Sequence, residues 1–179
     1  MNCKNLFLTG NIKVGKSTII NKVIDEYFKD KTIAGFKTLP FYEYGYLKGY
    51  YIENQLEENI FPKKENIVGI NSKNYGEKKC FGIAETFENK GVDILNKSID
   101  KNIDLVLLDE IGFFENEASV FKKNVHRVLD SEKRVLGVLK KKDTEFLKGL
   151  IARKDVMVIE VTEENRNNIV KQISNYWRL

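Results

Sequence analysis

The chain opens with a hydrophobic pattern that predicts a strand, a glycine-rich loop and then a helix. Residues 5–9 form a short apolar run that ends at Gly10, as is typical of a buried strand. Beyond Ser17, hydrophobic residues recur over positions 19–28 at the spacing of one helical face. One side of this helix would therefore pack on the sheet that contains the first strand.

The second half of the chain alternates between hydrophobic runs and stretches with helical spacing. Runs typical of strands buried on both faces lie at residues 105–108, 135–139 and 156–161. Helices are predicted at residues 87–101, 117–129 and 145–152, and a last helix containing 169–177 would be capped by Thr162. This alternation predicts an α/β fold with a mostly parallel sheet covered by helices on both faces. Since no repeat or linker interrupts the pattern, we expect a single domain over residues 1–179.

The middle third is predicted to be an insertion rich in β-hairpins. Gly45 and Gly49 punctuate a tyrosine-rich segment as hairpin turns do. Strands are predicted at residues 32–36, 41–52, 66–70 and 80–84, and polar loops at 56–65 and 71–79. We expect a pocket for a substrate or nucleobase in this part of the chain.

Composition excludes several classes of protein. The chain is 42% hydrophobic and 31% charged, which supplies a core and argues against intrinsic disorder. No apolar run reaches the roughly 18–20 residues that span a bilayer, and the N-terminal run is too short for a secretory signal. Cys3 and Cys80 stand apart from each other and from His126, so neither a zinc site nor a disulfide framework is predicted. We therefore expect a cytoplasmic, monomeric protein with two free thiols and no membrane contact.

The charge balance suits an anionic ligand without requiring nucleic acid. Thirty lysines and arginines against 26 acidic residues give a net charge of +4. Arginine binds phosphate through a planar fork, so each of the five arginines is a candidate ligand. They are Arg127, Arg134, Arg153, Arg166 and Arg178. The lysine run at 140–142 is interpreted as solvent-exposed surface.

Residues 10–17 carry the strongest chemical signal, because they match G-x-x-x-x-G-K-[ST] at every position. The glycines allow several backbone N–H groups to face one point, where the N-terminus of the following helix adds positive potential. Lys16 is predicted to reach the β- and γ-phosphates of a nucleotide as a catalytic cation, and the Ser17 hydroxyl to bind Mg²⁺. The predicted nucleotide site comprises Gly10, Asn11, Ile12, Lys13, Val14, Gly15, Lys16, Ser17 and Thr18.

An acidic pair follows the apolar run at 105–108. Ligand sites in open α/β sheets form at the carboxyl ends of strands, so Asp109 is the predicted acidic ligand of Mg²⁺. Glu110 is predicted to be the catalytic residue that polarises a water molecule against the γ-phosphate. Residues 109–112 also fit the D-x-x-G pattern of regulatory GTPases. That interpretation is secondary, because the string nearest to N-K-x-D, at 96–100, has its acid one residue late and lies in a predicted helix.

Phosphoryl transfer also requires a further cation near the developing negative charge. Arg153 ends the helix before the last predicted strand, and Arg166 begins the final helix just after that strand. Arg153 is the preferred catalytic candidate, although either residue could instead form a surface salt bridge. Lys13, inside the glycine-rich loop, is a third group that could touch the γ-phosphate.

Several short motifs, spread over nearly the whole chain, resemble those of the small P-loop nucleoside-triphosphatase family. Besides the glycine-rich loop they are G-F-x-T at 35–38, D-E-I-G-x-x-E at 109–115, Phe121, V-L-G at 135–137 and V-T-x-x-N-R at 161–166. The resemblance implies a RecA-like sheet in which one strand separates the P-loop strand from the Asp-Glu strand. It also implies slow Mg²⁺-dependent hydrolysis of ATP, GTP and other nucleoside triphosphates to nucleoside diphosphate and phosphate.

The resemblance further implies that Lys16 and Ser17 bind phosphate and metal, that Asp109 supports Mg²⁺, and that Glu110 activates water. Glu115 corresponds to the last acid of the D-E-I-G-x-x-E signature. The chain departs from the family at Leu39-Pro40, where an acid usually follows G-F-x-T, and at Phe113-Phe114, where many members carry methionine. These departures bear on base selectivity and on the roof of the site rather than on the phosphate chemistry.

Two other functions remain open from the sequence. A nucleotide or small-molecule kinase would use the same loop, although such kinases usually carry several arginines in a lid, and those here are not clustered. A nucleotide-gated binding protein could present the tyrosine-rich segment 42–51 and the lysines at 140–142 to a partner or to nucleic acid. Hairpin packing accounts more simply for the same tyrosines.

Overall fold

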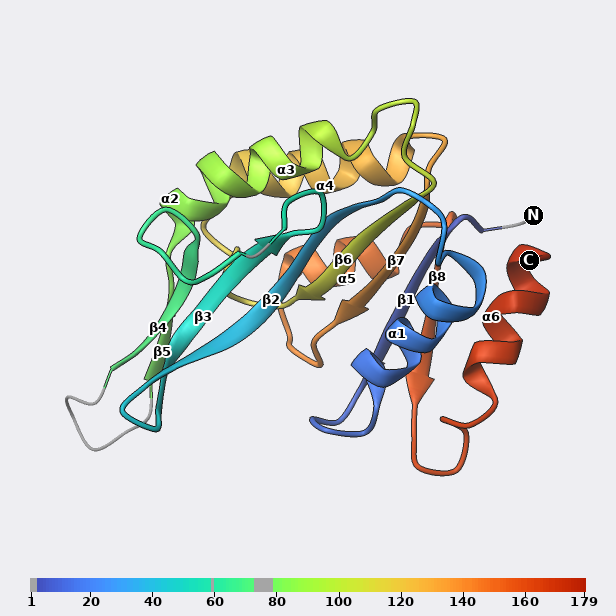
Figure 1. The fold of residues 1–179 in the computed structure, drawn as a ribbon, viewed down its shortest axis with the longest axis horizontal. Helices are drawn as coiled ribbons and strands as arrows, with labels where there is room; N and C mark the ends of the chain where they lie inside the picture. Colours follow the sequence, from blue (N-terminus) through green and yellow to red (C-terminus); the bar gives the residue numbers. More distant parts are fainter. Residues whose placement is uncertain (1–2, 59, 73–78) are drawn as a thin grey trace.

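The computed structural model describes residues 3–58, 60–72 and 79–179. Within these residues, eight strands form one mixed sheet in the order β5-β4-β3-β2-β6-β7-β1-β8 (Figure 1). The strands are β1 (Asn5–Gly10), β2 (Ile33–Glu43), β3 (Tyr46–Asn54), β4 (Ile67–Ser72), β5 (Lys79–Gly82), β6 (Leu105–Ile111), β7 (Arg134–Leu139) and β8 (Val156–Val161). The five strands from β2 to β8 in this order are parallel, and β3, β4 and β5 form an antiparallel extension.

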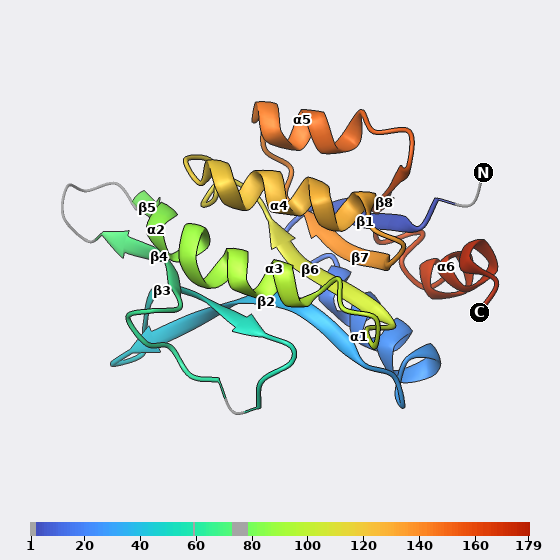
Figure 2. The ribbon, with the colours of Figure 1, turned by 90° about the horizontal axis from the view of Figure 1, so that it is seen from above.

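Helices cover both faces of the sheet, as the alternating sequence pattern predicts. On one face lie α1 (Lys16–Tyr27) and α6 (Ile169–Trp177), and on the other lie α4 (Ser119–Asp130) and α5 (Glu145–Ile151) (Figure 2). A helical segment packs beside α4 and consists of α2 (Ala84–Thr86), the π-helical turn η1 (Phe87–Gly91) and α3 (Val92–Lys97).

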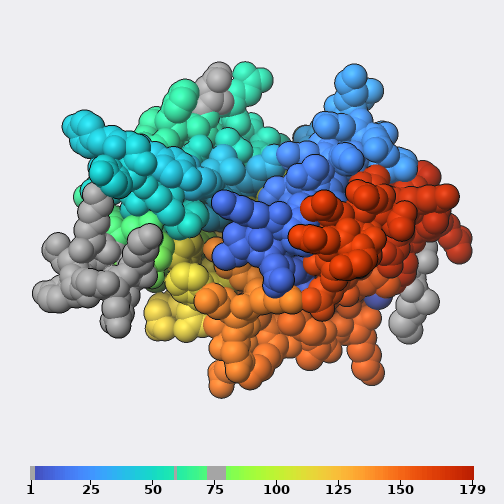
Figure 3. All heavy atoms as spheres, turned by 90° about the horizontal axis from the view of Figure 1, so that it is seen from below, coloured from blue at the N-terminus to red at the C-terminus, as the bar shows by residue number. Residues whose placement is uncertain are grey.

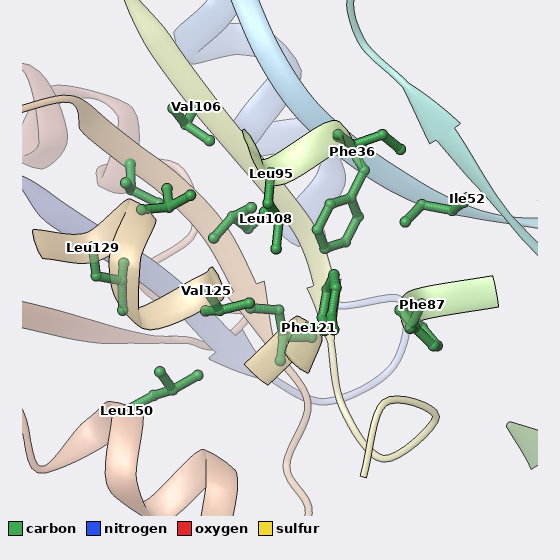
Figure 4. Packing of buried hydrophobic residues seen from close by; sticks show 14 of the residues in the cluster. Phe36, Ile52, Phe87, Leu95, Val106, Leu108, Phe121, Val125, Leu129 and Leu150 are labelled. Carbon is green, nitrogen blue, oxygen red and sulfur yellow. The ribbon is translucent and has the colours of Figure 1, made fainter. Parts of the chain in front are cut away.

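Two hydrophobic cores, one on each face of the sheet, hold these layers together. The larger core surrounds Phe121 of α4, whose ring centroid lies 4.9 Å from that of Phe87 and 5.9 Å from that of Phe36 (Figure 4). The smaller core joins α1 and α6 to the sheet, and there Trp177 packs edge-on against Phe28 with ring centroids 6.2 Å apart. β6 and β7 are covered on both faces, which is why their sequences are continuous hydrophobic runs.

The π-helical turn η1 also caps α4. Ala118, which precedes α4, offers no side chain that could accept a hydrogen bond from the helix. The carboxylate of Glu88 instead accepts hydrogen bonds from the backbone N–H groups of Val120 (3.0 Å) and Phe121 (2.8 Å). A carboxylate in this position satisfies free N–H groups and interacts favourably with the helix dipole.

The predicted hairpin and strand order are confirmed. β2 and β3 form the hairpin, joined at Tyr44 and Gly45, and β2 continues through residues 37–40, where no strand was predicted. As the family resemblance implies, β7 separates β1 from β6. The helix predicted at 87–101 begins earlier, at α2, and ends with α3. The predicted loop at 71–79 falls largely outside the described residues.

The predicted capping role of Thr162 is wrong. α6 begins at Ile169, and Thr162 instead closes a turn in which its N–H donates to the side-chain oxygen of Asn165 (2.8 Å) and its hydroxyl accepts from the Asn165 N–H (3.3 Å). Over the described ranges of the chain, no helix is both long and apolar enough to span a membrane.

The carboxyl ends of the parallel strands meet at one edge of the sheet. The loops that follow β1, β6 and β7 are therefore neighbours there, and open α/β sheets bind ligands at this edge. Seen from that edge, the N-terminal segment, in blue, lies between the cyan β2–β3 hairpin and the orange and red C-terminal segments (Figure 3).

Candidate active site

The loop between β1 and α1 has the backbone geometry of a phosphate-binding loop. Gly10, which ends β1, has a φ of 139°, and a Cβ there would lie 2.5 Å from the carbonyl oxygen of Val161. Gly15, the N-cap of α1, is left-handed with a φ of 114°. Glycine adopts both conformations readily, whereas a side chain would strain either one. Both glycines of the motif are therefore required by the path of the chain.

A cavity of about 860 Å³ lies over this loop. One wall consists of residues 10–13 and 15–18. The opposite wall is formed by Thr38 in the middle of β2, Tyr50 in the middle of β3, Cys80 of β5, and residues at or just after the ends of β6 and β7. Of the predicted nucleotide-site residues, Val14 alone is absent from the lining, because its side chain is buried in the smaller core. The predicted glycine-rich loop and the acidic strand thus meet at one cavity, which is the candidate active site.

Lys16 lies folded across the loop. Its ammonium donates hydrogen bonds to the backbone carbonyls of Gly10 (3.0 Å) and Asn11 (2.8 Å). Desolvation lowers the pKa of Lys16, the nearby Lys141 lowers it further, and Asp109 opposes both effects. Within the described parts of the chain, the hydrogen bonds of this ammonium go to neutral carbonyls, so it is well placed to exchange them for phosphate oxygens.

The acidic pair at the end of β6 lies where the regular pairing of this strand breaks. Leu108 and Ile111 both pack in the larger core, and the register with β7 shifts between them, so simple alternation does not hold across Asp109 and Glu110. Asp109 is almost fully buried, and this burial raises its pKa to about 6, against the opposing effect of nearby lysines including Lys16. Glu110 lines the cavity.

Lys140, at the end of β7, forms an ion pair with Glu110 in which the Nζ–Oε1 distance is 2.7 Å. Its ammonium also lies over the rings of Phe114 (5.1 Å to the centroid), Tyr50 (5.6 Å) and Phe113 (5.7 Å). Burial lowers the pKa of Lys140. The interpretation of residues 140–142 as solvent-exposed surface is confirmed for Lys141 and Lys142, which are exposed although they line the cavity. It is wrong for Lys140, which is half-buried.

Thr38 brings a hydroxyl to the same wall of the cavity. Its Oγ1 is buried and has no hydrogen-bond partner among the described residues. Lys37 pairs with Asp109 as the last residue of β2 in register with β6, so Thr38 follows in the middle of β2, near the end of β6. The sequence pattern included Thr38 in the G-F-x-T motif but gave it no role. A buried polar atom without a partner in a cavity points to a ligand that completes its hydrogen bonding.

The prediction that Arg153 is a catalytic cation is wrong. Arg153 precedes β8, and a residue before a parallel strand lies at the amino edge of the sheet, opposite the P-loop. There its guanidinium is bonded to Asp155 (2.7 Å) and Asp130 (2.5 Å) and lies 3.3 Å from Nδ1 of His126. Arg153 is thus a structural cation that joins α4 to the start of β8.

Arg166 lies beside the P-loop. A Cβ on Gly15 would be 3.8 Å from Cδ of Arg166, so the aliphatic part of this side chain lies close to Gly15 of the loop. Arg166 is exposed, and its guanidinium has no ion pair within the described parts of the chain. Its charge is therefore available to a ligand of the loop.

Glu115 organises the loop after β6 rather than lining the cavity. Its carboxylate is buried and accepts a hydrogen bond from the backbone N–H of Gly112. Burial raises its pKa to about 7, although the hydrogen bonds from its own N–H and from that of Gly112 oppose this shift. The turn that it closes carries Phe113 and Phe114, two of the rings around Lys140.

The residues present fit a magnesium ion held jointly with phosphates. Among the described residues no cluster of three or more His, Cys, Asp or Glu side chains could bind a metal by itself. Mg²⁺ prefers oxygen ligands and usually takes only one or two from the protein, with the rest from phosphates and water. The Ser17 hydroxyl, which lines the cavity, and the Asp109 carboxylate, which is buried near Lys16 and does not itself line the cavity, are oxygen ligands of that kind.

A P-loop at the end of one strand, with an acidic pair two strands away in a mostly parallel sheet, defines a P-loop nucleotide-binding enzyme of the RecA-like arrangement. The comparison with known families agrees. The sequence model of the NTPase family matches residues 5–174, and the chain belongs to this family.

Relatives align with the chain over nearly their whole length. Nucleoside-triphosphatase THEP1 of Thermotoga sp. (strain RQ2) is 30% identical over 169 residues, which cover 94% of this chain and 92% of that protein. Nucleoside-triphosphatase THEP1 of Methanosarcina barkeri is 28% identical over 174 residues, which cover 96% and 95%.

Two solved structures share the fold. THEP1 from Aquifex aeolicus superimposes with a TM-score of 0.68 at 24% identity, over 94% of this chain and 96% of that one. The human cancer-related nucleoside triphosphatase superimposes with a TM-score of 0.71 at 23% identity, over 96% of this chain and 95% of that one. These similarities confirm the α/β fold class.

Proposed function

We propose that this member of the NTPase family removes the terminal phosphate of nucleoside triphosphates, ATP and GTP among them, in a reaction that requires Mg²⁺. The observation that carries the proposal is the presence of Lys16 and Glu110 in one cavity, Lys16 on the P-loop and Glu110 at the end of the acidic strand. The relatives, which are named nucleoside-triphosphatases, support the same reaction.

The P-loop would bind the triphosphate. Backbone N–H groups of residues 10–17 and the N-terminus of α1 would surround the β-phosphate. The Lys16 ammonium would exchange the carbonyl oxygens of Gly10 and Asn11 for phosphate oxygens. Because hydrogen bonds to a charged acceptor are about twice as strong as those to a neutral one, this exchange favours binding.

Ser17 and Asp109 are the proposed protein ligands of Mg²⁺. When bound, Mg²⁺ would supply positive charge that offsets part of the charge on the transferred group. Asp109 must be ionised for this role, and the neighbouring Lys16 and Lys37 favour its ionised form.

Glu110 is the proposed general base. Its carboxylate would accept a proton from water as the water oxygen bonds to the γ-phosphorus, and the bond from that phosphorus to the β–γ bridging oxygen would break. The bridging oxygen leaves with the nucleoside diphosphate, and Lys16 is the protein cation placed to offset its charge. Glu110 then returns the proton to solvent.

Phosphate release from a panel of nucleoside triphosphates with Mg²⁺ tests the proposal. We expect E110Q to lower kcat by about 10²-fold or more, since general-base catalysis contributes about 10²–10⁴-fold. The matched control is E117Q, an exposed carboxylate seven residues further along the chain. Unchanged turnover in E110Q would remove Glu110 from the reaction.

The same assay separates hydrolysis from phosphoryl transfer to a second substrate. ATP labelled at the γ-phosphate would be incubated with the protein and each nucleoside monophosphate. We expect the label in inorganic phosphate at the same rate with and without the monophosphate. Label in a nucleoside diphosphate would contradict the proposal and indicate a kinase.

We also propose a monomeric, cytoplasmic protein whose partner is the nucleotide. Cys3 and Cys80 are both free thiols, as suits a reducing compartment. Light scattering on the purified chain should give a mass near 20.8 kDa, and twice that mass would contradict the monomer.

A further inference from the structure

The proposed hydrolysis needs a cation near the γ-phosphate besides Lys16, and Arg153 does not supply it. In the transition state, charge spreads over the non-bridging oxygens of the transferred phosphoryl group. The wall of the cavity opposite the P-loop holds Lys140, Lys141 and Lys142. Lys141 is paired with Glu160 at 2.5 Å and Lys142 is exposed, so the enclosed Lys140 is the strongest candidate.

Lys140 is fixed in place by its surroundings. Its backbone N–H donates to the carbonyl of Ile111 (2.9 Å), which ties the end of β7 to the end of β6. Three aromatic rings, those of Tyr50, Phe113 and Phe114, enclose the ammonium at 5.1–5.7 Å from their centroids. Such rings attract a cation while keeping most water away from it. The charge is thus held in position before a substrate arrives, which is the condition for electrostatic catalysis.

The ammonium of Lys140 also has hydrogen-bonding capacity to spare. An ammonium carries three N–H donors. In the described part of the chain, Glu110 is the one carboxylate paired with Lys140, and its other close neighbours are ring faces. Lys140 can therefore keep its contact with Glu110 and still donate to an anion that enters the cavity.

The electrostatic relation between Lys140 and the P-loop supports a shared anion. Lys16 and Lys140 line the same cavity. The pKa of Lys140 is lowered chiefly by burial, and the positive charge of Lys16 lowers it further. Two desolvated cations that face one cavity repel each other until an anion lies between them. A γ-phosphate held by Lys16 would fill that position.

We propose that Lys140 is a catalytic residue that donates to the γ-phosphate of a bound nucleoside triphosphate while it holds Glu110 toward the attacking water. No bond to Lys140 forms or breaks, and its proton stays on the nitrogen throughout. The inference rests on the proposed hydrolysis. It predicts that Lys140 matters for the triphosphate and its transition state, and not for a bound diphosphate, which lacks the γ-phosphate.

The test compares K140M with K133M, using the complete chain. Methionine keeps the aliphatic length of lysine and removes the charge. Lys133 is a matched control because it precedes the same strand and donates to the carbonyls of Lys101 (3.1 Å) and Ile103 (2.9 Å), far from the cavity. We expect K140M to lower kcat by about 10²-fold, the loss seen when one donor to a developing anion is removed. We expect K133M to keep the parent kcat within twofold.

Affinity for Mg²⁺·ADP, measured by calorimetry, distinguishes catalysis from general damage to the site. K140M should bind ADP within twofold of the parent protein, because ADP has no γ-phosphate. K140R, which keeps the charge, should retain at least a tenth of the parent kcat. K140Q also removes the charge, so it should show the same loss of kcat as is expected for K140M, and it replaces K140M in the test if K140M does not fold. A kcat of K140M and K140Q within threefold of the parent, or a loss of ADP affinity equal to the loss of kcat, would overturn the proposal.

E110Q separates this inference from the proposed function. A slow E110Q with a normal K140M means that the base is Glu110 and that Lys140 takes no part. A normal E110Q with a slow K140M means that the general base was assigned wrongly, while Lys140 acts on the phosphate.

Discussion

The carboxylate of Glu88 accepts a 2.8 Å hydrogen bond from the backbone N–H of Phe121, the residue at the centre of the larger core. One short contact therefore joins the π-helical turn, the start of α4 and the packing of that core. It takes the place of the side-chain cap that Ala118 cannot provide.

Loss of this cap should destabilise the fold. We expect E88A to lower the free energy of unfolding by about 1–2 kcal/mol, the usual value of a helix N-cap with a favourable charge. The control is E85A, an exposed glutamate in α2 on the same helical segment, which should change stability by less than about 0.5 kcal/mol. Urea denaturation of the three proteins measures the difference, and equal midpoints for E88A and E85A would contradict the capping role.

Local motifs carry the part of this site that is predictable from sequence. Gly10, Gly15 and Lys16 act through backbone geometry and a helix N-terminus, so eight consecutive residues define the loop wherever the sheet places it. Asp109 and Glu110 follow a hydrophobic run, which places them at the carboxyl end of a buried strand, where such sheets bind ligands. Neither inference depends on knowing which distant segments pack nearby.

Lys140 and Arg153 show what the sequence leaves open. The environment of Lys140 depends on β3 and the loop after β6, which bring Tyr50, Phe113 and Phe114 around a lysine from β7. The local sequence, a run of three lysines, does not predict those long-range contacts. The error about Arg153 has a different cause. A residue that precedes a parallel strand lies at the amino edge of the sheet, and Arg153 precedes the run at 156–161. The sequence alone therefore already placed Arg153 away from the P-loop.

Thr38 should be needed for turnover at a cost in stability. Its buried Oγ1 has no partner among the described residues, and an unsatisfied buried hydroxyl costs about 1–3 kcal/mol. We therefore expect T38V, which keeps the shape of the side chain, to be as stable as the parent or more stable, while kcat falls by about tenfold because one hydrogen bond to water or phosphate is lost.

T38S is the matched control for this prediction, since serine keeps the hydroxyl. It should retain kcat within about threefold, corresponding to less than 1 kcal/mol of lost transition-state stabilisation. Thermal unfolding and phosphate release should be measured on the same preparations. A T38V protein with parent-like turnover would show that the hydroxyl has no part in the reaction.

Arg166 and Arg153 should separate substrate binding from stability. The exposed Arg166 side chain lies beside Gly15 of the P-loop, so R166Q should raise KM for ATP about threefold to tenfold with little change in kcat, as expected for an exposed contact to phosphate. R153Q removes the links to Asp130 and Asp155, so it should lower the free energy of unfolding by about 1–2 kcal/mol and leave both kinetic constants unchanged. The opposite pattern would restore Arg153 as the functional arginine.

Stability should fall as the pH rises from about 4.5 to 7, and Glu115 should cause a defined part of that fall. In the folded protein burial raises the pKa of Glu115 from its usual value of 4.5 to about 7. Below pH 4.5 the group is protonated in both states, so its contribution is fully present. As the pH rises to about 7, the unfolded chain loses this proton while the folded protein still binds it, and folding is progressively disfavoured by up to about 3 kcal/mol.

The substitution E115Q removes this titration while keeping an acceptor for the N–H of Gly112. The parent protein and E117Q, which alters an exposed carboxylate, should both show the full fall, including the share that Asp109 contributes through its pKa of about 6. The free energy of unfolding of E115Q should fall less with pH. The difference between this fall and that of the parent should grow between pH 4.5 and 7 and stay constant above that range. Urea denaturation in steps of half a pH unit measures the three profiles. Parallel profiles for E115Q and the parent would mean that Glu115 ionises as freely in the folded protein as in the unfolded chain. Such a result would contradict the effect expected from burial of its carboxylate.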